Sequence, residues 1–193
     1  MNRAGKKLKS SLRKVFLKRR ESLSRDDVSE KSRDILKQLS ELISFKASDT
    51  VHCYISMNNR NEVLTGEIIE LCFALKKQVV VPKMVRESRL EHYYIEQGET
   101  LHPNSWGVPE PESSPERKAK ISDIDLILIP MVAADREKNR LGYGKGFYDR
   151  FLSKTYAVKA GLLFDVQLSN ETLPAEEHDV KLDLLITESG VIR

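Results

Sequence analysis

The segment Asp125 to Ile129, which reads Asp-Leu-Ile-Leu-Ile, limits the possible folds of this chain more than any other segment. A strand with an unbroken apolar run is typical of parallel sheets that are buried on both faces. Two further strands are expected at residues 50–55 and 79–81, and segments with helical spacing lie between the strands. Strands that alternate with helices predict an α/β fold, with a largely parallel sheet flanked by helices in three Rossmann-like layers.

The helices expected around this sheet begin at recognisable positions. The first covers about residues 6–23. Ser24 stands three residues before Asp27, a capping signal that predicts the start of a second helix. Thr65 can cap a third helix, and a fourth is expected over residues 146–154. The apolar stripe of the second helix comprises Val28, Ile35, Leu39, Leu42 and Ile43.

The other strands are less regular. Residues 79–81 are expected to form a buried strand that ends at Pro82, because proline has no N–H to donate. Residues 98–120 contain four prolines and are expected to be mostly loop, and long loops in a compact domain are often functional. Further strands are expected at residues 90–96, 157–164 and 184–187.

The composition is consistent with one domain over residues 1–193. Hydrophobic residues make up 40% of the chain, enough for a sizeable core, yet no apolar run approaches the roughly 18 residues that span a bilayer. The two cysteines and four histidines show neither CxxC nor HExxH spacing, so neither a disulfide framework nor a transition-metal site is expected. Free thiols in a reducing, cytoplasmic compartment are the expectation.

Basic residues concentrate near the N-terminus, in residues 6–20. This stretch is poor in acids, as a transit peptide would be, but its helical pattern runs into the domain without a break. The formal net charge is only +3, which gives little reason to expect a nucleic-acid partner. Most of these cations are therefore interpreted as a solvated helix face, and one or two of them are expected to meet an anionic ligand. The protein is expected to be a monomer.

The segment after the central strand carries a glycine-rich turn, with glycines at 142, 144 and 146. Glycines allow backbone N–H groups to approach a phosphate closely, and Arg140 and Lys145 add cations beside the turn. Such a turn taken alone is more often plain loop geometry. It matches neither GxxxxGK[ST] nor GxGxxG. The combination of strand, glycines, cations, an aromatic pair and Asp149 nevertheless favours a phosphate site.

Residues 140–150, Arg-Leu-Gly-Tyr-Gly-Lys-Gly-Phe-Tyr-Asp-Arg, resemble the signature of the 5-formyltetrahydrofolate cyclo-ligase family. Other family motifs have counterparts in order along the chain. They are Lys9-Ser-Ser-Leu-Arg13, Asn61-Glu62-Val63, Val81-Pro82-Lys83, Trp106-Gly-Val-Pro-Glu-Pro111 and His178-Asp-Val-Lys-Leu-Asp183. Several matches in the same order are far more specific than any one of them.

The resemblance implies an enzyme that uses ATP and Mg²⁺ to convert 5-formyltetrahydrofolate into 5,10-methenyltetrahydrofolate, with release of ADP and phosphate. It gives Lys145 and Arg140 catalytic roles. Spacing supports Lys9 and Arg13 independently, because residues four apart share one helix face, although an exposed basic face is the plainer interpretation. The ATP-binding residues implied are Lys9, Arg13, Arg140, Leu141, Gly142, Tyr143, Gly144, Lys145, Gly146, Phe147 and Tyr148.

The resemblance also assigns folate and metal contacts. Glu62 would bind the folate, although a lone loop glutamate is usually just solvated. Asp149 and Asp183 would be the Mg²⁺ ligands, but Asp149 could instead be an ordinary first-turn acid of a helix, and Asp183 could merely begin a strand. The substrate-binding residues implied are Ile55, Glu62, Trp106, Phe147 and Tyr148, and each apolar one could instead be a core residue.

Two other kinds of protein remain open at this stage. A different α/β phosphate-binding enzyme, such as a sugar-phosphate isomerase, could share the glycine turn and would not hydrolyse ATP. A nucleic-acid-binding module could use the basic N-terminal helix and would bind with a steep salt dependence. The family resemblance favours small-molecule substrates, with neither nucleic acid nor membrane as a partner.

Overall fold

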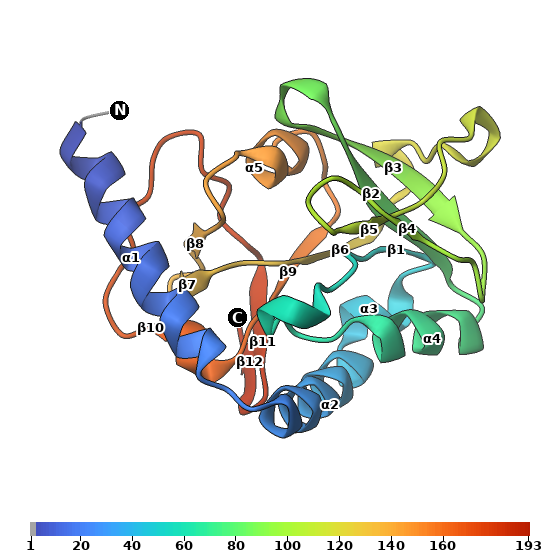
Figure 1. Ribbon diagram of the computed structural model, residues 1–193. Helices are drawn as coiled ribbons and strands as arrows, with labels where there is room; N and C mark the ends of the chain where they lie inside the picture. The colour runs from blue at the N-terminus through green and yellow to red at the C-terminus, as the bar shows by residue number, and fades with distance from the viewer. Residues whose placement is uncertain (1–2) are drawn as a thin grey trace.

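The computed structural model describes the backbone of residues 3–193 and the side chains of residues 5–57 and 59–193. Its main feature is a seven-stranded sheet with the strand order β12-β11-β9-β6-β1-β2-β3 (Figure 1). The five inner strands run parallel and the two edge strands run antiparallel to their neighbours, which confirms the predicted α/β fold. The strands are β1 (Thr50–His52), β2 (Gln78–Val85), β3 (Arg89–Ile95), β6 (Leu126–Ile129), β9 (Val158–Leu162), β11 (Leu184–Thr187) and β12 (Gly190–Ile192).

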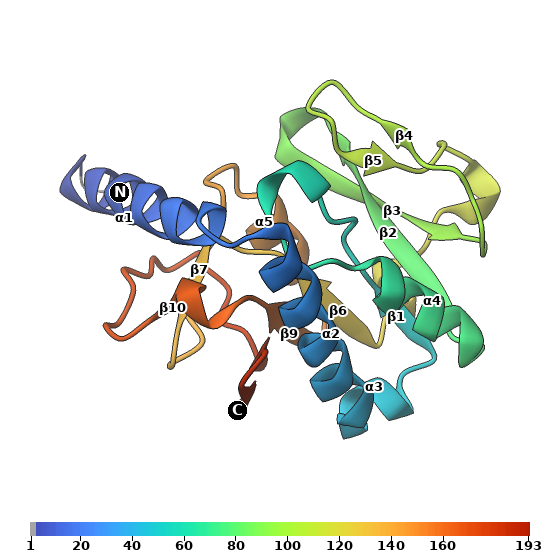
Figure 2. The ribbon, with the colours of Figure 1, turned by 60° about the horizontal axis from the view of Figure 1, so that its bottom comes forward.

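The central strand β6 shows why an unbroken apolar run is needed here. Leu126 and Leu128 pack into one core cluster, and Ile127 and Ile129 pack into another, because successive side chains point to opposite faces of a sheet. All four are fully buried. The first face is covered by α2, α3 and α4, and the second by α5 (Figures 1 and 2). These helices are α2 (Arg25–Glu41), α3 (Ile43–Ala47), α4 (Gly66–Ala74) and α5 (Phe147–Leu152).

The first helix, α1 (Arg3–Glu21), lies beside a second, three-stranded sheet and not on the main one (Figure 1). That sheet has the order β10-β7-β8, and its strands are β7 (Ala133–Asp135), β8 (Arg140–Leu141) and β10 (Leu168–Ser169). Phe16 of α1 is buried in a small apolar cluster with Val132 and Leu141. This contact places α1 next to the segment that follows β6. Among the described residues, none of the helices is long and apolar enough to cross a membrane.

The proline-rich segment forms a small projecting ribbon. Its two short strands, β4 (His102–Pro103) and β5 (Pro109–Glu110), pair with each other beside the β2–β3 hairpin (Figure 2). The rest of residues 98–120 consists of turns and short 3₁₀ segments, as predicted. The turn between β4 and β5 carries Trp106.

Of the two predicted helix caps, one is confirmed and the other is wrong. The Ser24 hydroxyl accepts a hydrogen bond from the Asp27 N–H, and the Asp27 carboxylate accepts one from the Ser24 N–H, which completes a capping box. Thr65 stands at the N-cap position just before α4, but its side chain makes no cap bond. Its hydroxyl instead accepts a hydrogen bond from the Ser56 N–H at 3.0 Å, which ties two loops together.

Two further residues depart from their predicted places. Ile43 does not extend the buried stripe of α2, because Leu42 is extended and starts a new helix, and Ile43 is 80% exposed. Pro82 does not end β2, which continues past it. Pro82 lies opposite His92, whose carbonyl points away from β2 and accepts from the Ala119 N–H. The ladder therefore needs no N–H at position 82.

A buried histidine pair between the sheet and α5 makes the fold sensitive to acid. His92 Nδ1 lies 3.2 Å from His52 Nε2, and the Phe151 ring packs against both rings. Burial lowers the pKa of both imidazoles, that of His92 to about 4. Unfolded histidines take up protons near pH 6.5. Because the folded pair resists protonation, stability is lost as the pH falls from about 6.5 towards 4.

We expect the free energy of unfolding to fall by about 2 kcal/mol or more between pH 7 and pH 5, since each pKa unit corresponds to 1.36 kcal/mol. Denaturant titrations at a series of pH values measure this change. His92→Gln, which cannot take up a proton, should show a shallower slope over the same range. An unfolding free energy that stays constant from pH 7 to pH 5 would contradict the role given to the pair.

Candidate functional site at the carboxyl edge of the sheet

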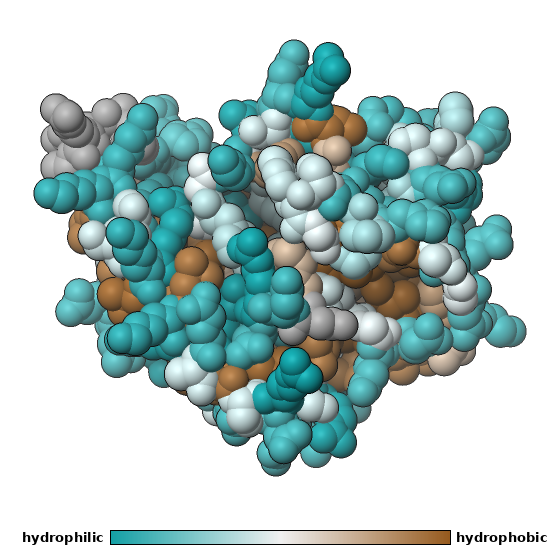
Figure 3. All heavy atoms as spheres, viewed as in Figure 1, coloured by the Kyte–Doolittle hydropathy of each residue, from teal (hydrophilic) through white to brown (hydrophobic). Residues whose placement is uncertain are grey.

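A cavity of about 450 Å³ opens beyond the carboxyl ends of β1 and β6. Ile55, which follows β1, and Pro130, which follows β6, both line it. Ligands of open α/β sheets bind at this edge. Every residue predicted for the site except Asp183 lines this one cavity. Polar side chains cover most of the face seen in Figure 3, so the apolar walls of the cavity are distinct from the general surface.

The glycine-rich turn joins β8 to α5 and forms one end of the cavity. Gly144 has φ +91° and Gly146 has φ +71°, backbone conformations that residues with a Cβ rarely adopt. The Arg13 Nε donates to the Gly142 carbonyl at 2.8 Å. A Cβ added to Gly144 would lie 3.1 Å from the Arg13 Cζ. The turn and the first helix therefore fit against each other, as the two predicted phosphate-binding segments should.

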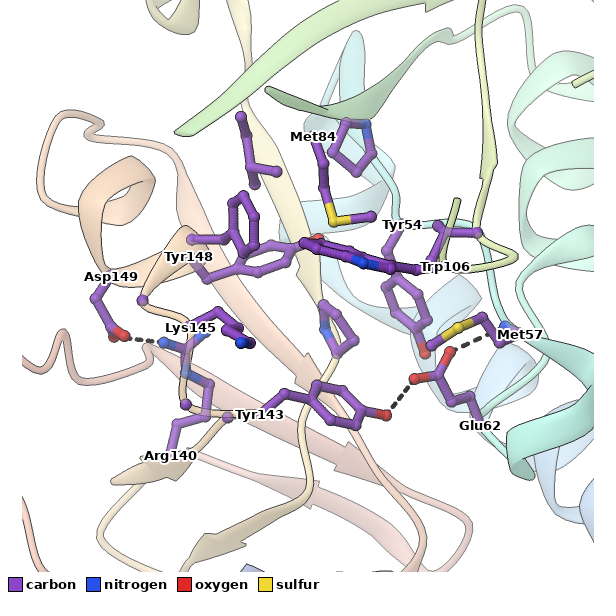
Figure 4. A pocket seen from close by; sticks show the side chains of 18 of the residues that line it. Tyr54, Met57, Glu62, Met84, Trp106, Arg140, Tyr143, Lys145, Tyr148 and Asp149 are labelled. Carbon is purple, nitrogen blue, oxygen red and sulfur yellow. Dashed lines mark hydrogen bonds and ion pairs between the residues drawn. The ribbon is translucent and has the colours of Figure 1, made fainter. Parts of the chain in front are cut away.

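Three charged groups meet beside this turn (Figure 4). Arg140 Nη2 donates to Asp149 Oδ1, and the Arg140 side chain is only 4% exposed. The Arg140 Nε is buried without a hydrogen-bond partner among the described residues. Lys145 is exposed and its ammonium points into the cavity, with no ion pair to any described residue. Arg140 is therefore paired with a carboxylate, whereas Lys145 is available to a ligand.

Lys9 is not part of a solvated helix face. It is 8% exposed and lines the cavity. Its Nζ lies 2.5 Å from Asp179 Oδ2 and 3.3 Å from Glu176 Oε1, so it holds the loop before β11 against α1. Asp179 also lines the cavity.

Glu62 lies at the other end of the cavity and is 4% exposed, which rules out a merely solvated loop glutamate. Its Oε2 accepts from the Met57 N–H at 2.9 Å, and its Oε1 accepts from the Tyr143 hydroxyl (Figure 4). A carboxylate has about four acceptor positions. The remaining ones can accept hydrogen bonds from a ligand.

Aromatic side chains form the walls between these two ends. Trp106 is 58% exposed and extends across the cavity toward Tyr148, and its ring lies 6.3 Å from that of Phe147 (Figure 4). Burial raises the pKa of Tyr148, whose hydroxyl has no hydrogen-bond partner among the described residues. Ile55 is partly buried at the same wall and also packs against the core cluster. Flat rings at this separation suit a planar heterocyclic ligand.

The structure does not bring Asp183 to the cavity. Asp183 precedes β11, and its carboxylate accepts from the Lys159 N–H at 2.7 Å, near the beginning of β9. The amino ends of parallel strands lie at the opposite edge of the sheet from their carboxyl ends, so Asp183 and Asp149 cannot hold one ion in this arrangement. The plainer interpretation, a residue that begins a strand, describes Asp183 better.

Sequence reasoning missed two charged residues near the site. Asp179 belongs to the same motif as Asp183 but reaches the cavity, and the order of the motif alone could not separate the two. Arg20 was grouped with the solvated basic residues, yet it is 2% exposed. A usable signal was its spacing, since residues 9, 13, 16 and 20 share one helix face.

The comparisons with known proteins agree with this geometry. The model of the 5-formyltetrahydrofolate cyclo-ligase family matches residues 5–188. A Schizosaccharomyces pombe protein, named a probable 5-formyltetrahydrofolate cyclo-ligase, is 33% identical and covers 96% of this chain and 97% of its own length. An Arabidopsis thaliana relative, named a mitochondrial 5-formyltetrahydrofolate cyclo-ligase, is 30% identical over 82% of this chain and 66% of its own.

A solved structure shares the fold. The NMR structure of 5,10-methenyltetrahydrofolate synthetase from Aquifex aeolicus matches with a TM-score of 0.84 and 32% identity. The match covers 96% of this chain and 92% of that one. On the family match, the sequence identity and the shared fold, this chain belongs to the 5-formyltetrahydrofolate cyclo-ligase family.

Proposed function

We propose that this chain converts 5-formyltetrahydrofolate and ATP into 5,10-methenyltetrahydrofolate, ADP and phosphate, the reaction that its family membership implies. The supporting observation is that one cavity has two chemically different ends. Lys9, Arg13 and Lys145 surround the glycine turn at one end. Glu62 lies among aromatic rings at the other. Two unlike ligands, a polyphosphate and a folate, can therefore meet between the ends.

The phosphate end would hold ATP through the turn from Leu141 to Tyr148 and the cations beside it. Gly144 has no side chain on the face that meets Arg13, so the phosphates and the guanidinium can come close to the backbone there. A guanidinium presents several donors in a fixed plane and suits phosphate oxygens. Lys9 would have to leave Asp179, or share it, to reach the same phosphates.

Asp149 and Asp179 would be the Mg²⁺ ligands in this cavity, with Asp179 in place of Asp183, which does not line it. Both line the cavity, and each is paired with a cation that could turn to phosphate instead. Mg²⁺ prefers oxygen ligands and commonly takes one or two carboxylates with waters and phosphates. The described residues contain no group of three metal-binding side chains, so phosphate or water oxygens would complete the coordination. The ion would neutralise polyphosphate charge.

We expect turnover to require a divalent cation. Without it, the negative charge of the polyphosphate opposes attack by another oxygen, and the carboxylates of Asp149 and Asp179 add to that repulsion. Exhaustive chelation with EDTA should lower the rate of product formation by at least roughly a hundredfold, and added Mg²⁺ should restore it. Product formation at the original rate in excess EDTA would contradict this expectation.

The folate end would bind the pterin through Glu62, whose free acceptor positions suit the N–H groups of that ring. Trp106, Phe147 and Tyr148 would stack on the pterin and aminobenzoate rings, with Ile55 as an apolar wall. The Tyr148 hydroxyl, buried and without a described partner, is a polar group that a bound ligand or water can satisfy.

The chemistry follows from the leaving group. A formyl oxygen leaves poorly, so in our proposal it attacks the γ-phosphorus of ATP and ADP departs. N10 then adds to the activated carbon and loses its proton, and the C–O bond breaks to release phosphate and leave the methenyl bridge. Lys145 would contact the transferred phosphoryl group, and Arg140 would bind its oxygens once released from Asp149. Positioning and charge neutralisation supply most of the catalysis in phosphoryl transfer.

Neither alternative from the sequence gains support. A sugar-phosphate isomerase would not need the aromatic end of the cavity. A nucleic-acid-binding face would need its cations in solvent, whereas Lys9 and Arg20 are buried against the rest of the fold. We keep small-molecule substrates as the proposed partners of a monomer.

The cytoplasm remains the proposed compartment, although one relative is named mitochondrial. The support is that α1 is part of the fold. Phe16 is buried in a core cluster, and Lys9 and Arg13 line the cavity. A cleavable targeting segment could not supply these contacts after its removal.

An absorbance assay tests the proposed function. Purified protein mixed with 5-formyltetrahydrofolate and MgATP should produce the near-ultraviolet band of the methenyl product, with one ADP and one phosphate for each product molecule. The same mixture without ATP should show no new band. Absence of the band in the complete mixture, with a folded protein, would reject the proposal.

A further inference from the structure

Arg20, in the last turn of α1, is an unusual charge for a protein interior. It is 2% exposed, its Nη1 donates to the Met131 carbonyl at 3.4 Å, and its guanidinium also lies close to the Tyr143 hydroxyl. Its Nε has no partner, and no carboxylate of the described residues lies within ion-pair distance of it. A buried cation that is so poorly paired costs several kcal/mol on its own. It therefore calls for a compensating group nearby.

The compensating group contacts Tyr143 as well. The Arg20 Cζ lies 5.7 Å from the centroid of the Tyr143 ring, and the Tyr143 hydroxyl donates to Glu62. Tyr143 thus connects a buried cation with a buried carboxylate. Glu62 likewise has no Lys or Arg partner within ion-pair distance among the described residues. At this depth, charges interact over longer distances than they do in water.

The backbone makes a second connection between the same two residues. Asn61, next to Glu62, has a left-handed backbone conformation with φ 47°. Its Nδ2 donates to the Leu23 carbonyl at 2.8 Å and to the Arg20 carbonyl at 3.3 Å. The end of α1 therefore holds the turn from which the Glu62 side chain extends into the cavity, while the Arg20 side chain packs against the Tyr143 ring.

We infer that Arg20 is a positioning residue for the folate end of the site, which, through Tyr143, aims the Glu62 carboxylate at the N–H groups of the ligand. The inference rests on the proposed function, because it takes Glu62 as the folate contact. Arg20 itself does not line the cavity, so it would not touch the substrate. One helix would then serve both ends of the cavity, with Lys9 and Arg13 at the phosphates and Arg20 at the folate.

The other ionisable groups around the Glu62 carboxylate are few. They are the phenols of Tyr54, Tyr143 and Tyr148 and the exposed guanidinium of Arg60. Burial raises the pKa of all three phenols, which stay neutral between pH 5 and pH 8. Arg60 is in solvent, where its charge is screened. Loss of Arg20 should therefore leave the Tyr143–Glu62 pair without the buried cation that packs against it.

The test is the affinity for 5-formyltetrahydrofolate without ATP, measured by equilibrium dialysis at pH 7. Arg20→Met should bind about tenfold more weakly than the parent protein, because a Glu62 carboxylate that is no longer held toward the ligand accepts fewer hydrogen bonds from it. Arg20→Lys, which keeps a cation at this position, should restore most of the affinity. MgATP affinity should stay within about twofold of the parent value, since mutations usually have independent effects on sites that are far apart.

A double-variant comparison separates positioning from general damage. In the background of Glu62→Gln, which has no carboxylate to position, Arg20→Met should change the folate affinity little. If Arg20→Met does not fold, Tyr143→Phe removes the hydrogen bond to Glu62 and should reproduce the loss of folate affinity.

Three results would overturn the inference. They are an unchanged folate affinity in Arg20→Met, an equal loss of MgATP binding, and a full loss of folate affinity that persists with Glu62→Gln. A parent protein that binds no folate would instead reject the proposed function itself, and this inference with it.

Discussion

Gly144→Val is expected to lower ATP-dependent product formation by roughly a hundredfold or more, equivalent to about 2.7 kcal/mol in the activation free energy. Two effects combine. A valine at φ +91° strains the backbone by about 1–3 kcal/mol. Its Cβ would also lie 3.1 Å from the Arg13 Cζ, so the guanidinium would be pushed away from the turn that it holds. Steady-state assays and nucleotide affinity measure the effect.

Gly98→Val is the matched control. Gly98 has φ +78°, nothing lies within 4 Å of the Cβ it would gain, and it does not line the cavity. The Gly98→Val variant should therefore lose about as much stability as Gly144→Val, while its turnover stays at the parent rate. If Gly144→Val folds and turns over normally, the turn is not the phosphate site. Equal losses of activity in both variants would assign the effect to backbone strain alone.

Lys145→Ala is expected to lower kcat by about 10²–10³-fold, the usual effect of removing one charged or hydrogen-bonding group that stabilises a transition state. Folate affinity and stability should change little, because the ammonium has no ion pair among the described residues. Rapid-mixing measurements of a single turnover, with separate folate and nucleotide titrations, distinguish this from a binding defect.

Lys154→Ala provides the control for this variant. Lys154 lies just after α5, is exposed and does not line the cavity. It should keep the parent rate. A kcat for Lys145→Ala within about threefold of the parent value would show that this cation does not act on the transferred phosphoryl group.

The sheet could be predicted from the sequence because the apolar composition of its strands indicates that they are buried. The run at 126–129 is apolar at every position, and both faces of β6 are buried. The ends of elements were harder. Ile43 fits the apolar stripe of α2 by its spacing, but the extended backbone at Leu42 directs the Ile43 side chain toward solvent. Local backbone breaks of this kind leave little trace in apolar periodicity.

The site residues could be predicted where a contiguous motif carries them. Residues 140–149 are held by one turn, so their proximity needs no tertiary information. The partner of Lys9 could not be foreseen, because its ion pair with Asp179 depends on how a distant segment packs. The choice between Asp179 and Asp183 failed for the same reason. Four residues along an irregular loop place one carboxylate in the cavity and the other at the opposite edge of the sheet.

Oxygen transfer from the substrate tests the central proposal most directly. If the formyl oxygen attacks the γ-phosphorus in this cavity, that oxygen must leave with the phosphate. Turnover of 5-formyltetrahydrofolate that carries ¹⁸O in its formyl group, with MgATP in unlabelled water, should release phosphate with one ¹⁸O atom, as mass spectrometry can show. Phosphate without the label, formed alongside the methenyl product, would show that the formyl oxygen is not the acceptor and would contradict the proposed chemistry.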